Sequence, residues 1–271
     1  MISTVLLLSI LGMGCQEQQI DKETPQKTNA LYQADLFYYG YEKTPQDHQK
    51  AASLYKKACE EQSVRGCLEW AHKLHYGFGT PRSSMEAKQI ITASLIEKAV
   101  QQCSKEDPQT CLRLGSIYML GLGVEKSTKK GAKWYQKACD AEQAQACYNL
   151  AFLYQKGEGV RKKPSEAVSL LKKACNADLM ISCASLATLY DSTFKGNERV
   201  VPIDDKRAAA LYQKSCDGGA MTGCFNLGAM YEFGKIGKTD TEKAASLYKK
   251  ACDGEYMRAC QKLENVHKSK D

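Results

Sequence analysis

Thirteen cysteines in a chain of 271 residues are the side chains with the widest choice of chemistry in this sequence. Apart from Cys15, they form six pairs whose members are eight positions apart. The pairs are Cys59 and Cys67, Cys103 and Cys111, Cys139 and Cys147, Cys175 and Cys183, Cys216 and Cys224, and Cys252 and Cys260. Zinc sites place their cysteines only a few residues apart, with histidines at a complementary distance. Disulfides therefore explain the six pairs better than a metal does, and we expect no metal or cofactor.

The eight-residue spacing also constrains the backbone between the two cysteines of a pair. On one continuous helix their Cα atoms would be about 12 Å apart, whereas a disulfide tolerates about 7 Å at most. The helix must end between them, and segments such as Asp217-Gly218-Gly219 and Asp107-Pro108 contain residues typical of turns and helix ends. Each pair is predicted to join the end of one helix to the start of the next.

The first 28 residues differ from the rest of the chain. Residues 1–14 are largely apolar, too short to span a bilayer, and end in Gly14 before Cys15, after which a polar stretch begins. We interpret 1–14 as a signal peptide, Cys15 as a lipidated N-terminus, and 15–28 as a polar tether. This segment resembles a bacterial lipoprotein signal, although no lysine or arginine precedes the apolar run and Gly12 stands where leucine is usual. Plain secretion with an unpaired Cys15, or a cytosolic chain with a mis-assigned start, are the alternatives.

Residues 29–271 repeat a two-helix unit. The second cysteine of a pair opens one helix, helix A, as in Cys147-YNLAFLY and Cys224-FNLGAMY; counting from that cysteine, leucine recurs at +3, a small residue at +4 and tyrosine at +7. These positions share one helical face. A second helix, helix B, ends at the next cysteine, as in Ala244-ASLYKKA-Cys252. The usual step of 36 residues between successive pairs predicts an all-α solenoid of about six repeats, with a polar closing helix after Cys260. Two repeats are longer. We expect the first to extend its helix B across 87–102, and the second to have its additional residues in the loop STFKGNERVVPIDD between its two helices.

The phrases G-x-x-Y-x-x-G-x-G-V and K-A-x-x-W/L-Y-x-K-A resemble the Sel1 repeat, a relative of the tetratricopeptide repeat. The cysteine pair at each junction resembles the cysteine-rich Sel1 proteins of Helicobacter. The resemblance covers about residues 29–267 and implies disulfides joining helix B of one repeat to helix A of the next. It also raises β-lactamase or penicillin-binding activity, which has been assigned to some cysteine-rich relatives, and disulfide exchange by an assembly factor, as alternative functions.

No complete catalytic set is visible, so we expect no catalytic residues. The Ser-x-x-Lys motif of β-lactamases begins at Ser53, Ser169 and Ser246, but each lies at the same place in helix B and the chain has no Ser-Asp-Asn or Lys-Thr-Gly partner motif. His72 and His75 are three residues apart without a third ligand, and we interpret them as ordinary side chains. The net charge of +7 comes from lysines spread over every helix B, which indicates a solvated face and no nucleic-acid partner.

Binding along the inner curve of the solenoid is the remaining function. Helix A positions +2 and +5 lie off the core stripe and are expected to face this groove; the +2 series is Glu69, Arg113, Asn149, Ser185, Asn226 and Lys262. In the similar tetratricopeptide repeats, groove asparagines hold a peptide backbone, so we assign ligand binding to Asn149 and Asn226, with Arg113 pairing a carboxylate. The alternative is that these are ordinary polar surface residues. The sequence predicts a lipid-anchored or secreted protein of the bacterial envelope, in an oxidising compartment and with its anchor in the outer membrane, that binds a protein, peptide or cell-wall fragment and meets the membrane only through its lipid.

Overall fold

A computed structural model describes residues 29–39, 44–193 and 200–268, with side chains up to residue 264. The predicted signal peptide at 1–14, the lipidated Cys15 and the tether at 15–28 lie outside the described residues.

The described part of the chain contains fourteen α-helices and no strand, as the repeat predicted. The helices are α1 (Ala30–Tyr39), α2 (His48–Glu60), α3 (Val64–Tyr76), α4 (Ser84–Ile90), α5 (Ala93–Gln102), α6 (Pro108–Leu120), α7 (Thr128–Asp140), α8 (Ala144–Lys156), α9 (Pro164–Asn176), α10 (Met180–Tyr190), α11 (Asp205–Asp217), α12 (Met221–Glu232), α13 (Thr241–Asp253) and α14 (Met257–Lys268). Helix A of successive repeats is α1, α3, α6, α8, α10 and α12.

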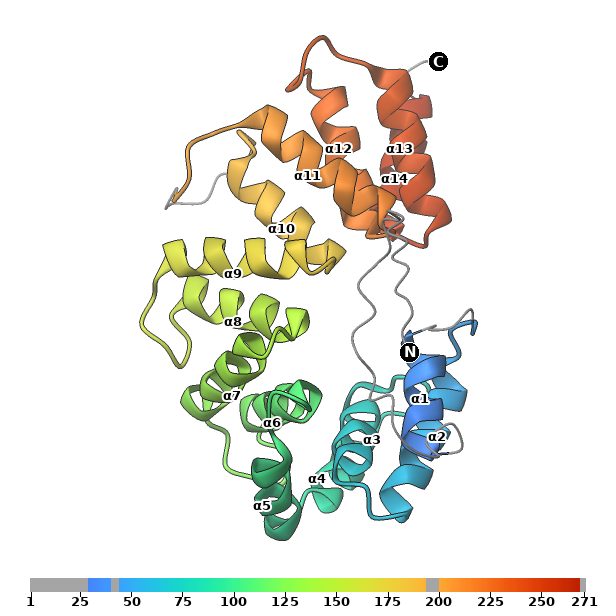
Figure 1. Cartoon of the computed structure of the whole chain (residues 1–271). Coiled ribbons are helices and arrows are strands. Elements are labelled where there is room, and N and C mark those ends of the chain that lie inside the picture. The colour runs from blue at the N-terminus through green and yellow to red at the C-terminus, as the bar shows by residue number, and fades with distance from the viewer. Residues whose placement is uncertain (1–28, 40–43, 194–199, 269–271) are drawn as a thin grey trace, which may run out of the picture.

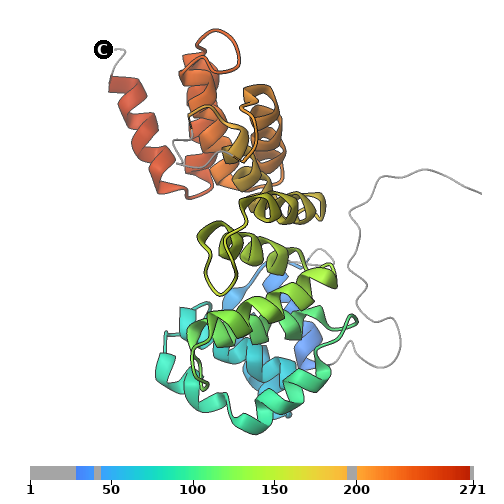
Figure 2. The ribbon, with the colours of Figure 1, turned by 90° about the vertical axis from the view of Figure 1, so that its left-hand side faces the viewer.

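The helix pairs follow an open arc, with α1 and α2 near one end and α13 and α14 at the other (Figure 1). Helix α6 lies on the inner side of the arc and its partner α7 on the outer side. A view from the side shows the later repeats stacked above the earlier ones (Figure 2). The expectation of an all-α solenoid is confirmed.

The long repeat differs from the prediction of a single extended helix B across 87–102, which is wrong. Two helices, α4 and α5, replace it, because the chain turns at Ile91 and Thr92. Ile90, Ile91 and Thr92 are consecutive β-branched residues, which are poor helix formers. Thr92 then caps α5, its hydroxyl oxygen accepting a hydrogen bond from the Leu95 amide at 3.2 Å. The buried Ile91 side chain fixes the bend in the core.

A disulfide closes every eight-residue junction. All six pairs are bonded, with Cα–Cα distances from 4.3 to 4.9 Å, and each joins the C-terminal end of helix B to the following helix. In five junctions the third residue after the first cysteine has a positive φ, between 57° and 87°: Gln62, Glu142, Asp178, Gly219 and Glu255. This left-handed residue reverses the chain, so the helix break predicted from the spacing takes the same form in these five junctions.

Lysines near the end of helix B link neighbouring repeats in series. The Nζ of Lys137 donates to the carbonyl of Cys103 at 2.7 Å, Lys173 to that of Cys139 at 2.6 Å, and Lys214 to that of Cys175 at 3.0 Å. Each of these carbonyls belongs to the end of the preceding helix B, where the helix dipole favours a cation. These lysines therefore cap the preceding repeat, and only part of the predicted lysine face is left to solvent.

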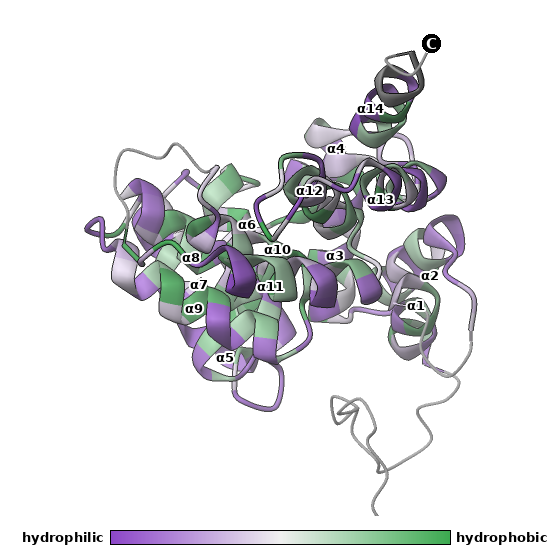
Figure 3. Cartoon of the chain, turned by 90° about the horizontal axis from the view of Figure 1, so that it is seen from above, coloured by the Kyte–Doolittle hydropathy of each residue, from purple (hydrophilic) through white to green (hydrophobic). Residues whose placement is uncertain are grey.

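Packing between helices depends on the small residue at +4 and on the tyrosine of helix B. A Cβ added to Gly115 would lie 2.4 Å from Cδ1 of Tyr135, so only glycine fits at this crossing. Tyr55, Tyr212 and Tyr248 are almost fully buried at the matching place in other repeats. Hydrophobic and hydrophilic segments alternate around the helices (Figure 3), as expected for one buried stripe on each.

The disulfides differ in exposure, which predicts an order of reduction. Cys59–Cys67 and Cys252–Cys260 are half-buried, whereas the eight cysteines of the four inner bonds are each at most 3% exposed. Because exchange requires access of a thiolate to sulfur, mild thiol under native conditions should reduce the two outer bonds first. Alkylation and peptide mass mapping over time will measure this order. Early reduction of an inner bond would contradict it and would favour a disulfide-exchange function.

The left-handed junction residue predicts opposite effects of two substitutions. Glu142 has a φ of 64°, a conformation that favours glycine, so Glu142→Gly should raise the free energy of unfolding by about 0.5–1 kcal/mol. Gly219 has a φ of 87° and open space where a Cβ would lie, so Gly219→Ala should lower it by about 1 kcal/mol through backbone strain alone. Urea unfolding with the disulfides intact will measure both. Equal effects of the same sign would show that this conformation does not control the junction.

Candidate functional site

The candidate site is the row of side chains at positions +2 and +5 of successive helices A, together with the helix B tyrosines that reach between them. We call this row the inner face. In the described residues it comprises Glu69 and His72 on α3, Arg113 and Ser116 on α6, Asn149 and Phe152 on α8, Ser185 and Thr188 on α10, Asn226 and Ala229 on α12, and Lys262 on α14. Its first part is occupied by ion pairs, whereas its middle part is open.

Glu69 is the centre of the first part. Its side chain is fully buried, and Oε1 accepts hydrogen bonds from Arg113 Nε at 2.7 Å and Gln109 Nε2 at 2.6 Å. Burial alone would raise the pKa of Glu69, but Arg113 and Lys73 outweigh it and hold the pKa far below its usual range. A buried carboxylate is stable here because two cations and a neutral amide surround it.

Lys73 is a second buried charge in this cluster. Its Nζ lies 3.5 Å from Glu69 Oε2 and 3.2 Å from the ring centroid of Tyr38, which provides a cation–π contact. Burial lowers the pKa of Lys73 to about 8, against the attraction of Glu69. An adjoining group ties α1 to this cluster, because Asp35 accepts from the Tyr55 hydroxyl at 2.7 Å and from Arg65 at 2.6 Å.

The structure places Arg113 differently from a cation free to bind a ligand. Only 7% of the residue is exposed, and its guanidinium is engaged by Glu69 of the preceding helix A. The signal was present in the sequence, since opposite charges occupy position +2 of consecutive repeats. The Glu69 pair supports a structural role for Arg113.

Tyrosine hydroxyls follow the Glu69 cluster along the inner face, and one of them, that of Tyr212, also donates to Asp191 Oδ2 at 3.3 Å. Tyr135 Oη lies 3.2 Å from Ser116 Oγ and within hydrogen-bonding reach of Asn149, while Tyr212 Oη lies 3.1 Å from Thr188 Oγ1 and within reach of Asn226. Burial raises the pKa of both tyrosines, so both stay neutral donors. In each case the hydroxyl connects position +5 of its own repeat to position +2 of the next.

Both predicted asparagines therefore lie on the inner face, and both are half-buried. Asn149 Oδ1 also accepts a hydrogen bond from Gln145 Nε2 at 3.0 Å. A side-chain amide has two donors and two acceptor lone pairs, so hydrogen-bonding capacity remains after these contacts. This is the chemistry required to hold a peptide backbone.

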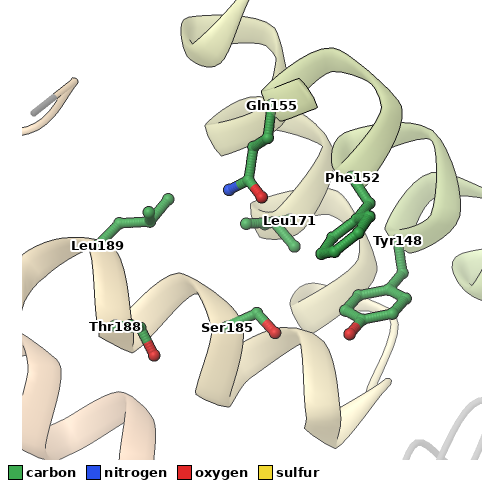
Figure 4. Close-up of a pocket in the computed structure, with 7 residues that line it drawn as sticks. All are labelled: Tyr148, Phe152, Gln155, Leu171, Ser185, Thr188 and Leu189. Atoms are coloured by element: carbon green, nitrogen blue, oxygen red, sulfur yellow. The ribbon is translucent and has the colours of Figure 1, made fainter. Parts of the chain in front are cut away.

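A pocket that sequence reasoning did not predict opens between α8 and α10. It has a volume of about 170 Å³ and is lined by Tyr148, Phe152, Gln155, Leu171, Ser185, Thr188 and Leu189 (Figure 4). Four of these side chains are apolar or aromatic, and none carries a charge. Phe152 is 48% exposed, an unusual position for a large apolar side chain.

The residues considered for catalysis are placed apart from this face. Ser53, Ser169 and Ser246 are exposed on helix B; the Ser53 hydroxyl donates to the Lys50 carbonyl at 2.8 Å and the Ser169 hydroxyl to the Ser165 carbonyl at 3.3 Å. A hydroxyl bonded to its own helix is not oriented by a base.

The described residues also bear on metal binding and on membrane spanning. Among the described residues, no group of three or more potential metal ligands exists, and no helix is both long and apolar enough to cross a membrane. The predicted histidine pair is held separately: His75 Nδ1 is 3.1 Å from Ser84 Oγ, and burial lowers the pKa of His72 well below its usual value.

Comparison with known proteins now defines the class of this solenoid. The model of the Sel1 repeat matches residues 31–63, 108–142, 144–179, 182–219 and 222–256, which together exceed half of the chain. The chain therefore belongs to the Sel1 repeat family, whose repeats mediate protein–protein interactions. The unmatched interval contains the repeat in which α4 and α5 replace one helix B. The six disulfides indicate an oxidising, extracytoplasmic compartment.

Solved structures with TM-scores above 0.5 show the same fold. A Sel1 repeat protein from Oxalobacter formigenes has a TM-score of 0.61 and 21% identity, over 85% of this chain and 90% of its own. The immunity protein Pa5087 from Pseudomonas aeruginosa has a TM-score of 0.54 and 17% identity, over 90% and 88%. The cysteine rich protein B of Helicobacter pylori is 28% identical over 52% of this chain and 96% of its own, with a TM-score of 0.35. No curated protein matches the sequence.

The buried position of Glu69 predicts a large effect of removing its partner. Arg113→Met should lower the free energy of unfolding by about 3 kcal/mol, because the carboxylate stays buried with one cation fewer. Adding Glu69→Gln should recover part of this loss. Lys249→Met is the matched control, since the Lys249–Asp253 pair is about two-thirds exposed and should contribute nothing measurable. Chemical unfolding of the four proteins will decide, and equal effects of Arg113→Met and Lys249→Met would show that Glu69 is not the centre of the cluster.

Proposed function

We propose that this protein is an exported scaffold whose inner face binds an extended segment of a partner protein. The observation that carries the proposal is the row of neutral hydrogen-bonding groups between α6 and α12, in which Asn149 and Asn226 keep unused capacity beside a pocket. An extended segment presents one N–H and one C=O at each residue, and side-chain amides can bond both. A cell-wall peptide offers the same amide chemistry and is included in the proposal.

The distribution of charge supports binding at this part of the face. The charges of the first part are satisfied internally, because Glu69 is already paired with Arg113 and Lys73. A ligand there would have to displace strong buried pairs, whereas the middle of the face offers hydrogen bonds without breaking any. The affinity is therefore expected to come from α8, α10 and α12.

We infer the location of the scaffold from its disulfides and from Cys15. The disulfides require export, and we propose that Cys15 carries a lipid that holds the solenoid at the bacterial envelope, in the outer membrane. A tether of residues 15–28 would then separate the inner face from the lipid. This arrangement suits a protein that captures partners close to a membrane surface.

A substitution of both groove asparagines tests the proposal. In crosslinking pull-downs from the native envelope, Asn149→Ala combined with Asn226→Ala should lose a partner that the wild type captures. With that partner purified, affinity should fall about tenfold or more, since each lost hydrogen bond contributes about 1 kcal/mol.

Ser169→Ala combined with Ser246→Ala is the matched control, because both serines are exposed on helix B and away from the inner face. It should keep the partner. Thermal unfolding of both variants, with disulfides intact, will show that the fold is retained. The proposal fails when the groove variant and the control bind the partner equally well.

A further inference from the structure

The pattern of tyrosine contacts on the inner face is interrupted in the repeat of α8 and α9, between two repeats that have it. In the repeats before and after it, position +5, the helix B tyrosine and position +2 of the next helix A form a polar triad: Ser116, Tyr135 and Asn149, and then Thr188, Tyr212 and Asn226. In the repeat of α8 and α9 the same three positions are Phe152, Leu171 and Ser185. The hydroxyl and one of its partners are thus replaced together by apolar groups.

The replacement leaves space on the inner face. Leucine has neither the ring nor the hydroxyl that fills this position in the neighbouring repeats, and Leu171 is buried as the floor of the pocket. Phe152 and Leu189 lie on opposite sides of it (Figure 4). The volume of about 170 Å³ is comparable with a dry cavity of about 150 Å³ that holds a benzene ring. The pocket is therefore the size of one large side chain.

We propose that this pocket receives a single aromatic or long aliphatic side chain of the segment bound on the inner face, and so determines which segments bind. The inference rests on the proposed function, which it makes more specific. A charged side chain is excluded because none of the lining residues carries a charge to pair with it, and an unpaired buried charge is costly. Lys156 Nζ lies over the Phe152 ring, 4.5 Å from its centroid, and pairs with Glu158 at 3.8 Å.

The rim of the pocket fits the backbone that would carry such a side chain. Gln155 directs its amide toward the pocket (Figure 4), and among the described residues this amide makes no hydrogen bond. Ser185 and Thr188 lie on the facing helix, and each donates a hydrogen bond to a carbonyl of that helix. Thr188 Oγ1 also contacts Tyr212 Oη at 3.1 Å, which leaves it one lone pair, whereas the Ser185 oxygen keeps both of its lone pairs to accept. A neutral, extended segment with one apolar side chain matches both the floor and the rim.

The test uses capped pentapeptides, Ser-Gly-Xaa-Gly-Ser, in which Xaa is Phe, Leu, Ala or Asp. They are titrated into the full mature chain while NMR signals of Leu171, Thr188 and Leu189 are followed. The Phe and Leu peptides should shift these signals and bind about tenfold or more tightly than the Ala peptide, because they bury an additional apolar side chain. The Asp peptide should produce no shift.

Phe152→Ser combined with Leu171→Tyr rebuilds the polar triad of the neighbouring repeats and should abolish the shifts while keeping the fold. Phe152→Ser alone alters a half-exposed side chain, cannot disturb the core, and should weaken the Phe peptide. Any one of three results would overturn the proposed role of the pocket. These are equal binding of the Phe and Ala peptides, unchanged binding to the rebuilt variant, and no shift with any peptide.

The same variants distinguish the proposed role of the pocket from the proposed function of the inner face. If the rebuilt variant still captures the wild-type partner with full affinity, the proposed role of the pocket is wrong and the proposed function stands. If the asparagine variant also captures this partner with full affinity, the proposed function fails as well. Analytical ultracentrifugation of the chain without peptide tests whether a second copy of this chain occupies the pocket. Self-association that the rebuilt variant removes would assign the pocket to a second copy of this chain and overturn a peptide side chain as its occupant.

Discussion

The reversal of the chain between one helix B and the next helix A is the constraint on which the rest of the molecule depends. Eight residues must end a helix, turn and begin another while the cysteine Cα atoms stay within 4.9 Å. In five of the six junctions the turn passes through a left-handed residue, and a disulfide holds each of the six closed. Because the two cysteines are held at nearly the same distance at every junction, each helix A meets its neighbours at a similar place, and positions +2 and +5 become one continuous face.

That face combines two kinds of surface with different consequences. Around Glu69 it is an electrostatic cluster of buried charges that pair with one another. Around Leu171 it is neutral and hollow. The first arrangement fixes the early repeats to one another, and the second is where the proposed segment would bind without displacing buried ion pairs. In this proposal, rigidity and recognition lie in separate repeats of the same array.

Much of this architecture is visible in the sequence, because the period of the cysteines, leucines and tyrosines reports one helix pair at a time. Local reasoning was less successful where the outcome depends on contacts between repeats. The opposite charges of Glu69 and Arg113 at the same position of consecutive repeats were compatible with an ion pair. Predicting that they pair required the relative position of the two helices A, which the sequence does not contain. The sequence likewise shows that Leu171 replaces the usual tyrosine. That this replacement opens a pocket could be seen only from the structure, in which Phe152 and Ser185 line the same pocket. The bend at Ile91 and Thr92 was a local feature that the repeat pattern obscured.

The lysines that cap the preceding repeat also give the array an order of assembly. Lys137, Lys173 and Lys214 each reach back to a cysteine carbonyl about one repeat earlier, so these repeats are completed only by the chain that follows them. As a polypeptide emerges N-terminus first, such a repeat can form its helices and its disulfide but remains uncapped until its successor arrives. Capping of these repeats therefore proceeds from the N-terminus toward the C-terminus, and each repeat is capped only after the next one has been added.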